Sequence, residues 1–376
     1  MNKKVVLACQ TCGYLLKDIA NTYSEAGYGV TVMASRSSQK TIKEDLRKGI
    51  KLSSVISYNK SSLLKRILTW VVCTVQMWFK IIFTYRRCFA LFVSNPPLAP
   101  LLPLVMRNKF SLLIWDIYPD VLVNQHVVSE RNVIAKWWRK ANKKVYKRAE
   151  HVFTISDGMK ECLSQYVDAD RIKVIPLWPD KTNLRRVKKQ DNLFIKENHL
   201  EGKFVVMYSG NLGNTHRMDV LVDVAKRVND DDIVFVLIGE GGKKKMIEQR
   251  IAEEGVKNVL LLPYQPYDFL SHSLSAADIA VITLDSVSSQ MSVPSKTFNM
   301  MSLGAPLMCI ASPESELGNI VRKYQVGEIF QPENIEGITE FVLKLKRDDA
   351  LRRQYAENSL KASREFSVDN AKMFLE

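Results

Sequence analysis

Short apolar runs and longer amphipathic segments follow each other regularly along the chain. The short runs are rich in Val, Ile and Leu, and Gly, Pro or Asn bound them, which is typical of buried strands in a parallel sheet. The segments between the runs repeat apolar residues at helical spacing. The predicted strands are 5–9, 30–34, 89–94, 111–115, 151–155 and 172–176 in the first half and 204–208, 234–238, 259–262, 279–283, 307–310 and 327–330 in the second.

This alternation predicts an α/β fold with two domains, each a Rossmann-like, doubly wound parallel sheet. A chain of 376 residues is long enough to bury two cores. Segment 178–190 is basic and contains Pro179, and we interpret it as the linker between domains 1–180 and 181–357. The last helix, about 358–376, is expected to pack back on the first domain. Ligands of such sheets bind beyond the carboxyl ends of the strands, here in a central cleft that the two domains face.

The charge of the chain is uneven. Residues 1–180 hold 28 Lys and Arg against 13 Asp and Glu, whereas residues 181–376 hold 26 against 27. The net charge of +14 therefore belongs to the first half. Nucleic acid and anionic membrane surfaces are the usual partners of such a basic half.

The six cysteines stand mostly in apolar surroundings, which indicates reduced core thiols and a cytosolic setting. Cys9 and Cys12 form a C-x-x-C at a strand-to-helix turn, so a redox role stays open as an alternative. No second Cys/His pair stands near them to complete a zinc site, and we expect no metal. The chain enters its first strand directly and shows no signal-peptide pattern.

Two helical segments of the first half suit a membrane surface or a core. Residues 67–79 contain no charge, but a bilayer span needs about 20 residues. The helix around them, 63–83, is either buried against the sheet or dips partly into a membrane. Segment 136–148, KWWRKANKKVYKR, carries seven basic residues beside two tryptophans. It suits a lipid headgroup interface, a solvated surface helix with inward tryptophans, or nucleic acid.

A glycine loop between a strand and a helix lies at 204–225. The apolar run ends at Ser209-Gly210, Gly213 follows in a polar loop, and helical spacing begins near Met218. Such a junction directs free backbone N–H groups and the positive end of a helix at one point, which suits a phosphate.

A second phosphate signal lies at 293–306, VPSKTFNMMSLGAP. Pro294-Ser295 starts a helix, and Lys296 stands in its first turn, where a cation opposes the helix dipole. The lysine is favourable there if an anionic phosphate binds at the same end. The turn IGEGG, 238–242, adds a glycine loop at a strand end, with Glu240 as a candidate contact for a ligand hydroxyl.

WDIYPD, 115–120, places two carboxylates just beyond a strand. Asp116 and Asp120 are candidates for acid/base chemistry or substrate binding. The structural alternative, strongest for Asp120, is a helix cap.

In this order and spacing the motifs resemble those of retaining glycosyltransferases of family 4, which have the GT-B fold, especially bacterial capsule, exopolysaccharide and O-antigen enzymes. The resemblance covers nearly the whole chain. It implies a nucleotide-diphosphate sugar donor, here a UDP-sugar, with no metal and no further cofactor. It rests on WDIYPD (115–120), AEHVFTISDGM (149–159), IKVIPLWPD (172–180), YSGNLGNTHRMDVL (208–221), IGEGG (238–242), AADIAVITL (276–284) and VPSKTFNMMSLGAP (293–306).

The resemblance also implies roles for single residues. His216, Lys296 and the glycine-loop amides are expected to stabilise the departing diphosphate, and Asp116 to orient the acceptor or sugar hydroxyl. Met291 and Asn299 occupy the two acidic positions of the E-x7-E motif that binds the donor ribose in the family. The other predicted contacts are Gly13, Ser209, Gly210, Asn211, Arg217, Glu240, Tyr264 and Ser295 for the donor, with Asn299, and Tyr118 and Asp120 for the acceptor.

In this family the N-terminal domain binds the acceptor, here a polyprenyl-diphosphate-linked or oligosaccharide acceptor of bacterial surface polysaccharide synthesis. Its basic charge would hold a cytoplasmic enzyme peripherally at the inner face of the cell membrane. Two rival functions remain. A sugar-nucleotide epimerase of similar fold would act without any acceptor. A nucleic-acid-binding protein would use the basic half and show steeply salt-dependent binding.

Overall fold

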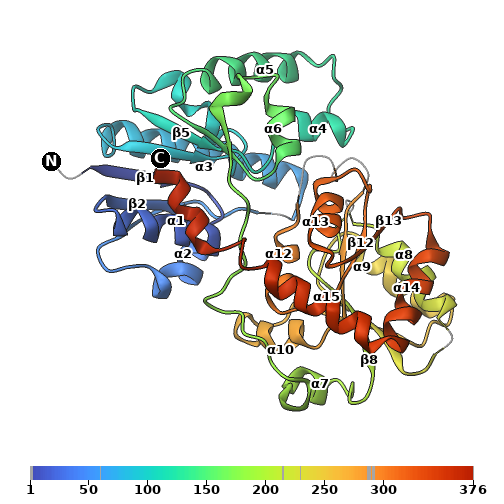
Figure 1. Ribbon diagram of the computed structural model, residues 1–376. Helices are drawn as coiled ribbons and strands as arrows, with labels where there is room; N and C mark the ends of the chain where they lie inside the picture. The colour runs from blue at the N-terminus through green and yellow to red at the C-terminus, as the bar shows by residue number, and fades with distance from the viewer. Residues whose placement is uncertain are drawn as a thin grey trace. The chain divides into compact units, whose positions relative to one another are not determined.

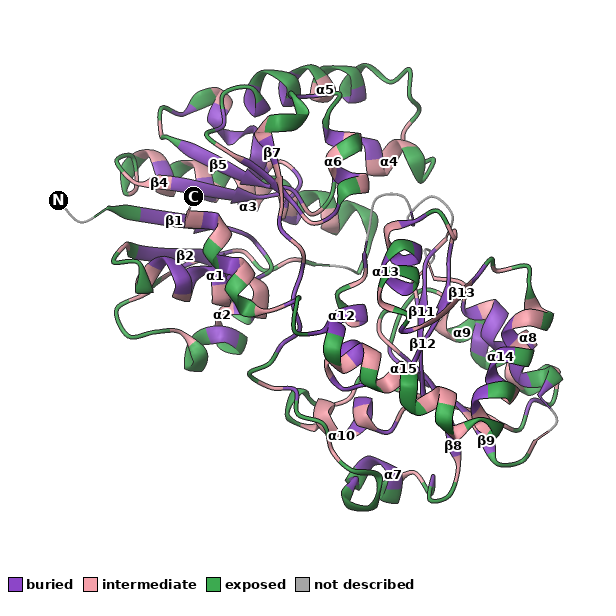
Figure 2. Ribbon diagram, in the orientation of Figure 1, coloured by how far each residue is buried: buried purple, intermediate pink, exposed green. Residues whose placement is uncertain are grey.

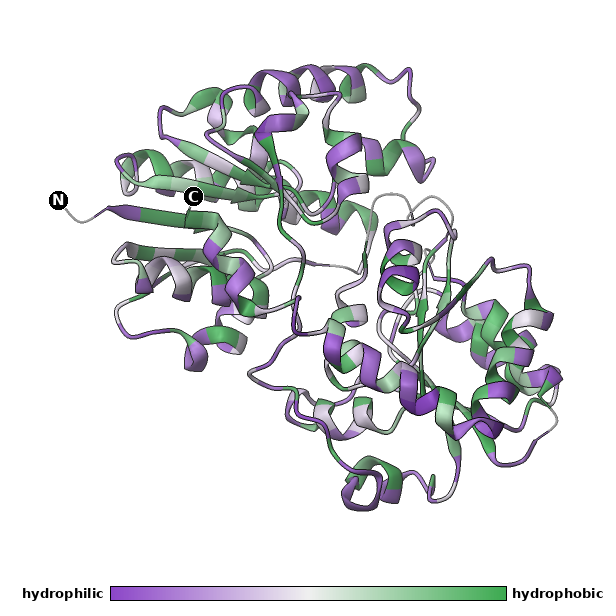
Figure 3. Ribbon diagram, viewed as in Figure 1, coloured by the Kyte–Doolittle hydropathy of each residue, from purple (hydrophilic) through white to green (hydrophobic). Residues whose placement is uncertain are grey.

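The computed structural model describes residues 3–59, 61–213, 216–228, 230–285, 289 and 293–375. The chain forms two compact units (Figure 1). Unit 1 contains Met1–Pro176 and Val368–Glu376, and unit 2 contains Leu177–Ser367. Most strands of both units are largely buried (Figure 2) and hydrophobic (Figure 3), as the apolar runs predict.

Unit 1 is built on a seven-stranded parallel sheet of order β3-β2-β1-β4-β5-β6-β7. Val5 of the central strand pairs with Val30 on one side and Phe89 on the other. The strand order reverses between β1 and β4, so ligands are expected beyond the carboxyl ends of these strands. The strands are β1 (Lys4–Ala8), β2 (Gly29–Ser35), β3 (Lys51–Val55), β4 (Phe89–Val93), β5 (Phe110–Leu113), β6 (Val152–Thr154) and β7 (Ile172–Val174).

One core cluster of unit 1 joins one face of this sheet to α3, η2, α5 and α6. The helix α1 packs against η6, where Tyr23 Oη donates a hydrogen bond to the carbonyl O of Phe374 (2.7 Å). The helices of unit 1 are α1 (Tyr14–Glu25), α2 (Arg36–Ile42), η1 (Lys43–Asp45), α3 (Leu63–Phe83), η2 (Ala99–Val105), α4 (Asp120–Asn124), α5 (Val133–Tyr146), α6 (Asp157–Leu163), η3 (Ala169–Arg171) and η6 (Val368–Leu375).

The edge strand β3 is missing from the sequence prediction. Its sequence, KLSSV, is too polar to stand out as an apolar run. An edge strand can be polar because it is partly exposed and buries only some of its residues. The helix α3 has the predicted bounds, but only one of its sides is buried against the sheet. Among the described helices, α3 alone has the length and composition that would let it cross a membrane.

Unit 2 is built on a six-stranded parallel sheet of order β10-β9-β8-β11-β12-β13. The order reverses between β8 and β11, where Val206 pairs with Ile279. The strands are β8 (Phe204–Ser209), β9 (Ile233–Ile238), β10 (Val259–Leu262), β11 (Ile279–Thr283), β12 (Leu307–Ile310) and β13 (Gly327–Phe330).

Helices cover this sheet, and the last of them, α15, packs against α12, α13 and α14. The chain therefore returns to unit 1 at Val368, and not at the predicted 358. The helices of unit 2 are η4 (Lys189–Asp191), α7 (Leu193–Glu197), α8 (Met218–Arg227), α9 (Lys244–Glu253), η5 (Tyr267–Phe269), α10 (Leu270–Ser275), α12 (Ser295–Ser302), α13 (Glu316–Tyr324), α14 (Ile335–Arg347) and α15 (Asp349–Ala362).

Candidate functional site

The glycine loop after β8 lies at the switch point of the unit 2 sheet. Its backbone is anchored from behind, because Gly210 N donates to the carbonyl O of Ile238 (2.9 Å) and Leu212 N to that of Glu240 (2.9 Å). Gly239 lies so close to this loop that a Cβ there would stand 1.8 Å from the carbonyl O of Gly210. The second glycine turn therefore supports the first loop by close backbone packing.

The Lys296 side chain extends from the first turn of α12 to Gly210. Its Nζ lies 3.8 Å from the ring centroid of Tyr208, and a Cβ at Gly210 would stand 2.6 Å from that Nζ. Nζ is buried and has no hydrogen-bond partner among the described residues. Burial lowers the pKa of Lys296 to about 7. The N-terminus of α12, which begins at Ser295, has no side-chain cap. An unpartnered ammonium beside free helix N–H groups is the strongest sign of an anion site in unit 2.

His216 lies beside this ammonium but is neutral. Its Nδ1 is 2.7 Å from the carbonyl O of Thr283, which can only accept, so Nδ1 carries the proton and Nε2 is the free nitrogen. Burial, followed by the charge of Lys296, lowers the pKa of His216 to about 4. His216 is therefore uncharged in the protein without ligand, so its predicted stabilisation of the diphosphate would not rest on a positive charge.

Lys243 is a cation of this loop that the sequence analysis missed. Its Nζ donates to the carbonyl O of His216 (2.8 Å) and so holds the loop against the start of α9. It directly follows the glycine turn, in a run of three lysines that gives no hint as to which one faces the loop.

Arg217 and Glu240 are both paired with other charged side chains. The Arg217 guanidinium donates to both carboxylate oxygens of Asp219 and pairs with Glu333 at 3.4 Å. Glu240 accepts from Lys244 Nζ at 2.7 Å. Their predicted donor contacts would require these pairs to open.

The remaining residues predicted to bind the donor differ in their contacts and exposure. The carbonyl O of Asn211 accepts from Tyr208 Oη at 2.7 Å. Tyr264 is exposed, with its Oη 3.5 Å from the carbonyl O of Glu240. Ser209 is the last residue of β8. Met291 lies outside the described residues.

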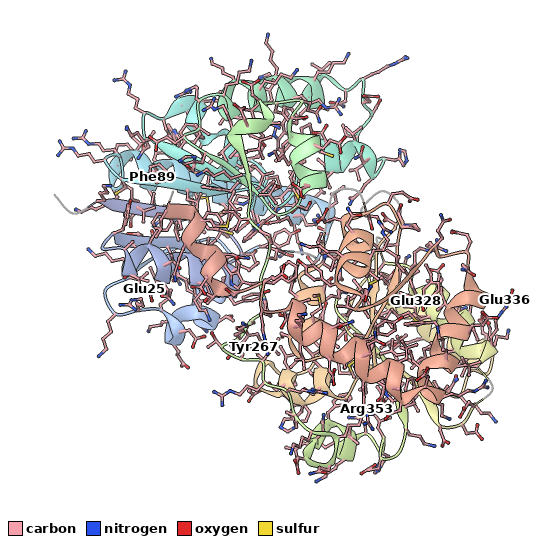
Figure 4. The ribbon with its side chains drawn as sticks, in the orientation of Figure 1. Glu25, Phe89, Tyr267, Glu328, Glu336 and Arg353 are labelled. Atoms are coloured by element: carbon pink, nitrogen blue, oxygen red, sulfur yellow. The ribbon has the colours of Figure 1, made fainter. Side chains whose placement is uncertain are left out.

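Asn299 points to the segment that leaves unit 1. Its Oδ1 accepts from the backbone N–H of Asp180 at 3.1 Å. The Asp180 carboxylate in turn accepts from Asn183 and from Tyr267 (labelled in Figure 4). This network ties α12 to the first residues of unit 2, so Asn299 has a structural role at the position that the resemblance assigns to ribose binding.

In unit 1, Asp116 follows β5 at the carboxyl edge of the sheet. Ser94 Oγ accepts from the backbone N–H groups of Trp115 (2.9 Å) and Asp116 (3.1 Å) and holds this turn in place. The Asp116 side chain reaches solvent, and desolvation by the surrounding protein raises its pKa. A carboxylate at this edge can orient a hydroxyl by accepting a hydrogen bond from it.

Asp120 belongs to a closed network of protein groups. Its Oδ1 accepts from Arg139 Nε at 2.8 Å, and its Oδ2 accepts from Tyr166 Oη. The residue is buried at the start of α4. This geometry favours a structural role for Asp120, in place of the predicted acceptor contact.

Four aromatic side chains form a ladder near Asp116. Tyr58 stacks on Trp70 (centroids 5.9 Å apart), Trp70 meets Tyr118 edge to face (6.1 Å), and Tyr118 stacks on Trp138 (6.0 Å). Arg66 lies over Trp70 at 5.1 Å. Of these residues only Tyr118 was predicted for the acceptor site, because the others lie far apart in sequence and nothing local links them.

Gly13 precedes α1, and a Cβ there would enter open space, so no contact requires a glycine. Cys9 and Cys12 are free, buried thiols, and burial raises the pKa of Cys12 to about 12. Since the thiolate is the reactive form, this environment opposes redox chemistry. Among the described residues, no group of three His, Cys, Asp or Glu could hold a metal ion.

Comparisons with known proteins find similar sequences and similar folds among glycosyltransferases. Residues 189–362 match the family model "Glycosyl transferases group 1". The chain is 26% identical over 219 residues to "Putative colanic acid biosynthesis glycosyl transferase WcaI" of Escherichia coli (strain K12), covering 56% of this chain and 54% of that protein. It is 24% identical over 275 residues to "Probable glycosyltransferase WbjE" of Pseudomonas aeruginosa, covering 72% and 69%. The chain thus spans about half the length of the first relative and about two thirds of the second.

Two solved structures have a similar fold over almost their full length. HepE of Anabaena, in complex with UDP-glucose, has a TM-score of 0.76 at 15% identity, covering 100% of this chain and 98% of that one. WaaG, a glycosyltransferase involved in lipopolysaccharide biosynthesis, has a TM-score of 0.70 at 13% identity, covering 99% and 98%. At such identities these likenesses show the fold alone.

Proposed function

Because residues 189–362 match the family model of group 1 glycosyltransferases and the chain has the GT-B fold, we propose that the chain is a retaining glycosyltransferase. It would move a sugar from a UDP-sugar to a lipid-linked or oligosaccharide acceptor in bacterial surface polysaccharide synthesis. The sequence relative named for colanic acid biosynthesis supports this substrate class. The observation that carries the proposal is the buried, unpartnered Lys296 ammonium beside Gly210.

In this proposal the donor diphosphate is the anion that pairs with this ammonium. A diphosphate at Gly210 would receive the charge of Lys296, the N–H groups of the glycine loop and the free end of α12. Negative charge grows on the diphosphate as the sugar leaves, so groups fixed in advance lower the barrier. Nearby negative charge would also raise the pKa of Lys296 and keep it protonated.

Unit 1 supplies the acceptor side in this proposal. Asp116 would orient the attacking hydroxyl, and the aromatic ladder with Arg66 offers apolar faces and a cation for a sugar linked to a lipid diphosphate. No metal is required, since the cationic groups replace it. The basic first half favours an anionic bilayer, so the enzyme would work peripherally at the inner face of the cell membrane.

A thermal-shift screen with UDP, GDP, ADP and TDP tests the donor class. We expect UDP and UDP-glucose to stabilise the protein by mass action, and Lys296→Met to lose most of this stabilisation. Lys257→Met, which removes an exposed lysine of the same unit, is the matched control. Equal stabilisation of wild type and Lys296→Met by UDP-glucose would remove the basis of the proposal.

A further inference from the structure

The helix α3 has two apolar stripes on opposite sides. The inner stripe repeats every fourth residue and is buried in unit 1: Thr69, Cys73, Met77 and Ile81. Surface helices of globular proteins place polar residues on the opposite side. Here that side, the outer stripe, exposes large apolar side chains: Leu64 (80%), Leu68 (61%), Val71 (43%), Val75 (47%), Phe79 (49%) and Phe83 (74%).

Polar contacts fasten the inner side of α3 to the sheet. Gln76 Oε1 accepts from the backbone N–H of Ile56 at 2.8 Å, and Lys80 Nζ donates to Ser53 Oγ at 3.3 Å. Gln10 Nε2 donates to the carbonyl O of Thr69 at 3.1 Å. Because α3 is part of the fold of unit 1, it cannot leave to span a bilayer. Its outer stripe runs along the surface of the unit for about 30 Å.

Cations border the outer stripe at both ends. Lys65 and Arg66 stand at its start, and Arg86 and Arg87 follow its end. Two hollows of about 470 and 560 Å³ adjoin that end, and both are lined by Lys4, Arg86 and Arg87. Hollows with several cations suit the phosphates of anionic lipid headgroups.

The helix α5 lies on the same face of the unit 1 sheet as α3. It packs on η2, which also contacts α3, and the three elements share one core cluster. Ile134 (67%) and Trp137 (55%) are exposed on α5, as is Val105 (64%) of η2. Lys140 and Lys144 are exposed beside them. Apolar and aromatic side chains beside lysines are the composition of a surface that lies in a lipid interface.

We propose that α3 lies flat in the headgroup region of an anionic bilayer, with its outer stripe inserted among the acyl chains. The inference rests on the proposed function for the location of the enzyme and names the surface that docks. A second copy of this surface would bring the cations at the stripe ends into mutual repulsion. Nucleic acid would pair with the cations but leave the stripe in water.

Co-sedimentation with vesicles tests the proposal. On phosphatidylethanolamine vesicles with phosphatidylglycerol, Leu64→Ser/Leu68→Ser should weaken partitioning roughly tenfold or more, since two large apolar side chains lose their insertion. Arg86→Gln/Arg87→Gln should weaken it about fivefold for each charge, on anionic vesicles only. Leu193→Ser, at an exposed leucine of unit 2 (47%), should partition like the wild type.

Stabilisation by UDP-glucose, measured on the same variants, keeps the two proposals separate. It should be unchanged in all of them, which also shows that they fold. The proposed docking surface is wrong if the wild-type protein does not bind anionic vesicles. It is also wrong if Leu64→Ser/Leu68→Ser binds them as the wild type does. The proposal also fails if the wild type is a dimer and Leu64→Ser/Leu68→Ser is a monomer with unchanged vesicle binding. Absence of any effect of UDP-glucose would instead count against the proposed function and leave the vesicle result standing.

Discussion

Units 1 and 2 each bury a charged side chain near the carboxyl edge of a parallel sheet, and they surround it in opposite ways. In unit 1, Asp120 has Arg139 and Tyr166 on its two oxygens. In unit 2, the Lys296 ammonium has the ring of Tyr208 and no hydrogen-bond acceptor among the described residues. A buried charge with protein partners stabilises the fold, whereas one without partners destabilises it until a ligand arrives. This difference is our reason for placing the proposed donor site in unit 2.

Removal of the Lys296 charge should have the largest effect. We expect Lys296→Met to lower turnover about 10²–10³-fold, because one preorganised group that stabilises developing charge contributes this much. Its free energy of unfolding should stay equal or rise, since an unpaired buried charge is removed. Turnover with UDP-glucose and a urea titration measure the two quantities. A large loss of stability would mean that Lys296 supports the fold, as Asp120 does.

Asp120→Asn should show the opposite profile. Loss of the charge beside Arg139 and Tyr166 should reduce the free energy of unfolding by about 2–3 kcal/mol. Stabilisation by UDP-glucose should persist in the folded fraction. Glu130→Gln is the matched control, because Glu130 approaches the same arginine at 3.8 Å but is exposed; we expect less than about 0.5 kcal/mol. A stable Asp120→Asn protein with lost acceptor binding would restore the acceptor role.

Much of the architecture was predictable from the sequence. The apolar runs matched most strands, and α3 begins and ends where its pattern indicates. The helix-start lysine at 296 also stood out, because a cation there is unfavourable without an anion. These signals are local, and local patterns are what a sequence displays directly.

Other features depend on contacts between distant segments. The exposure of the outer stripe was not visible, because an apolar helix looks alike whether one side or both are covered. The neutrality of His216 depends on burial and on Lys296, 80 positions away in the chain. By contrast, the pairing of Arg217 with Asp219 and of Glu240 with Lys244 joins near neighbours and could have been anticipated.

A methyl group at Gly210 should produce a smaller effect. Gly210 has φ +154° and lies against Lys296 Nζ, so Gly210→Ala forces both the backbone and the ammonium to move. We expect an affinity for UDP-glucose about tenfold lower, measured by calorimetry. Gly13→Ala enters open space and should bind normally. Equal losses in both variants would contradict the role assigned to Lys296.

The pH dependence of stability should also respond to the charge of Lys296. The pKa of Lys296 is about 7 in the folded protein and about 10.4 when unfolded. Below pH 7 both states hold the proton, and between these values the unfolded state holds more. The burial penalty therefore applies fully below pH 7 and declines as pH rises toward 10. Wild-type stability relative to Lys296→Met should rise over this range in urea titrations; a flat difference would indicate an unperturbed lysine.

Proton uptake on donor binding tests the central claim most directly. Lys296 is largely uncharged above pH 7 in the free protein, and a bound diphosphate would restore its charge. Calorimetry of UDP-glucose binding near pH 8, in buffers of different ionisation enthalpy, should show uptake of about one proton per site. Lys296→Met should show none. Binding by the wild type without proton uptake would contradict the claim that Lys296 awaits the donor diphosphate.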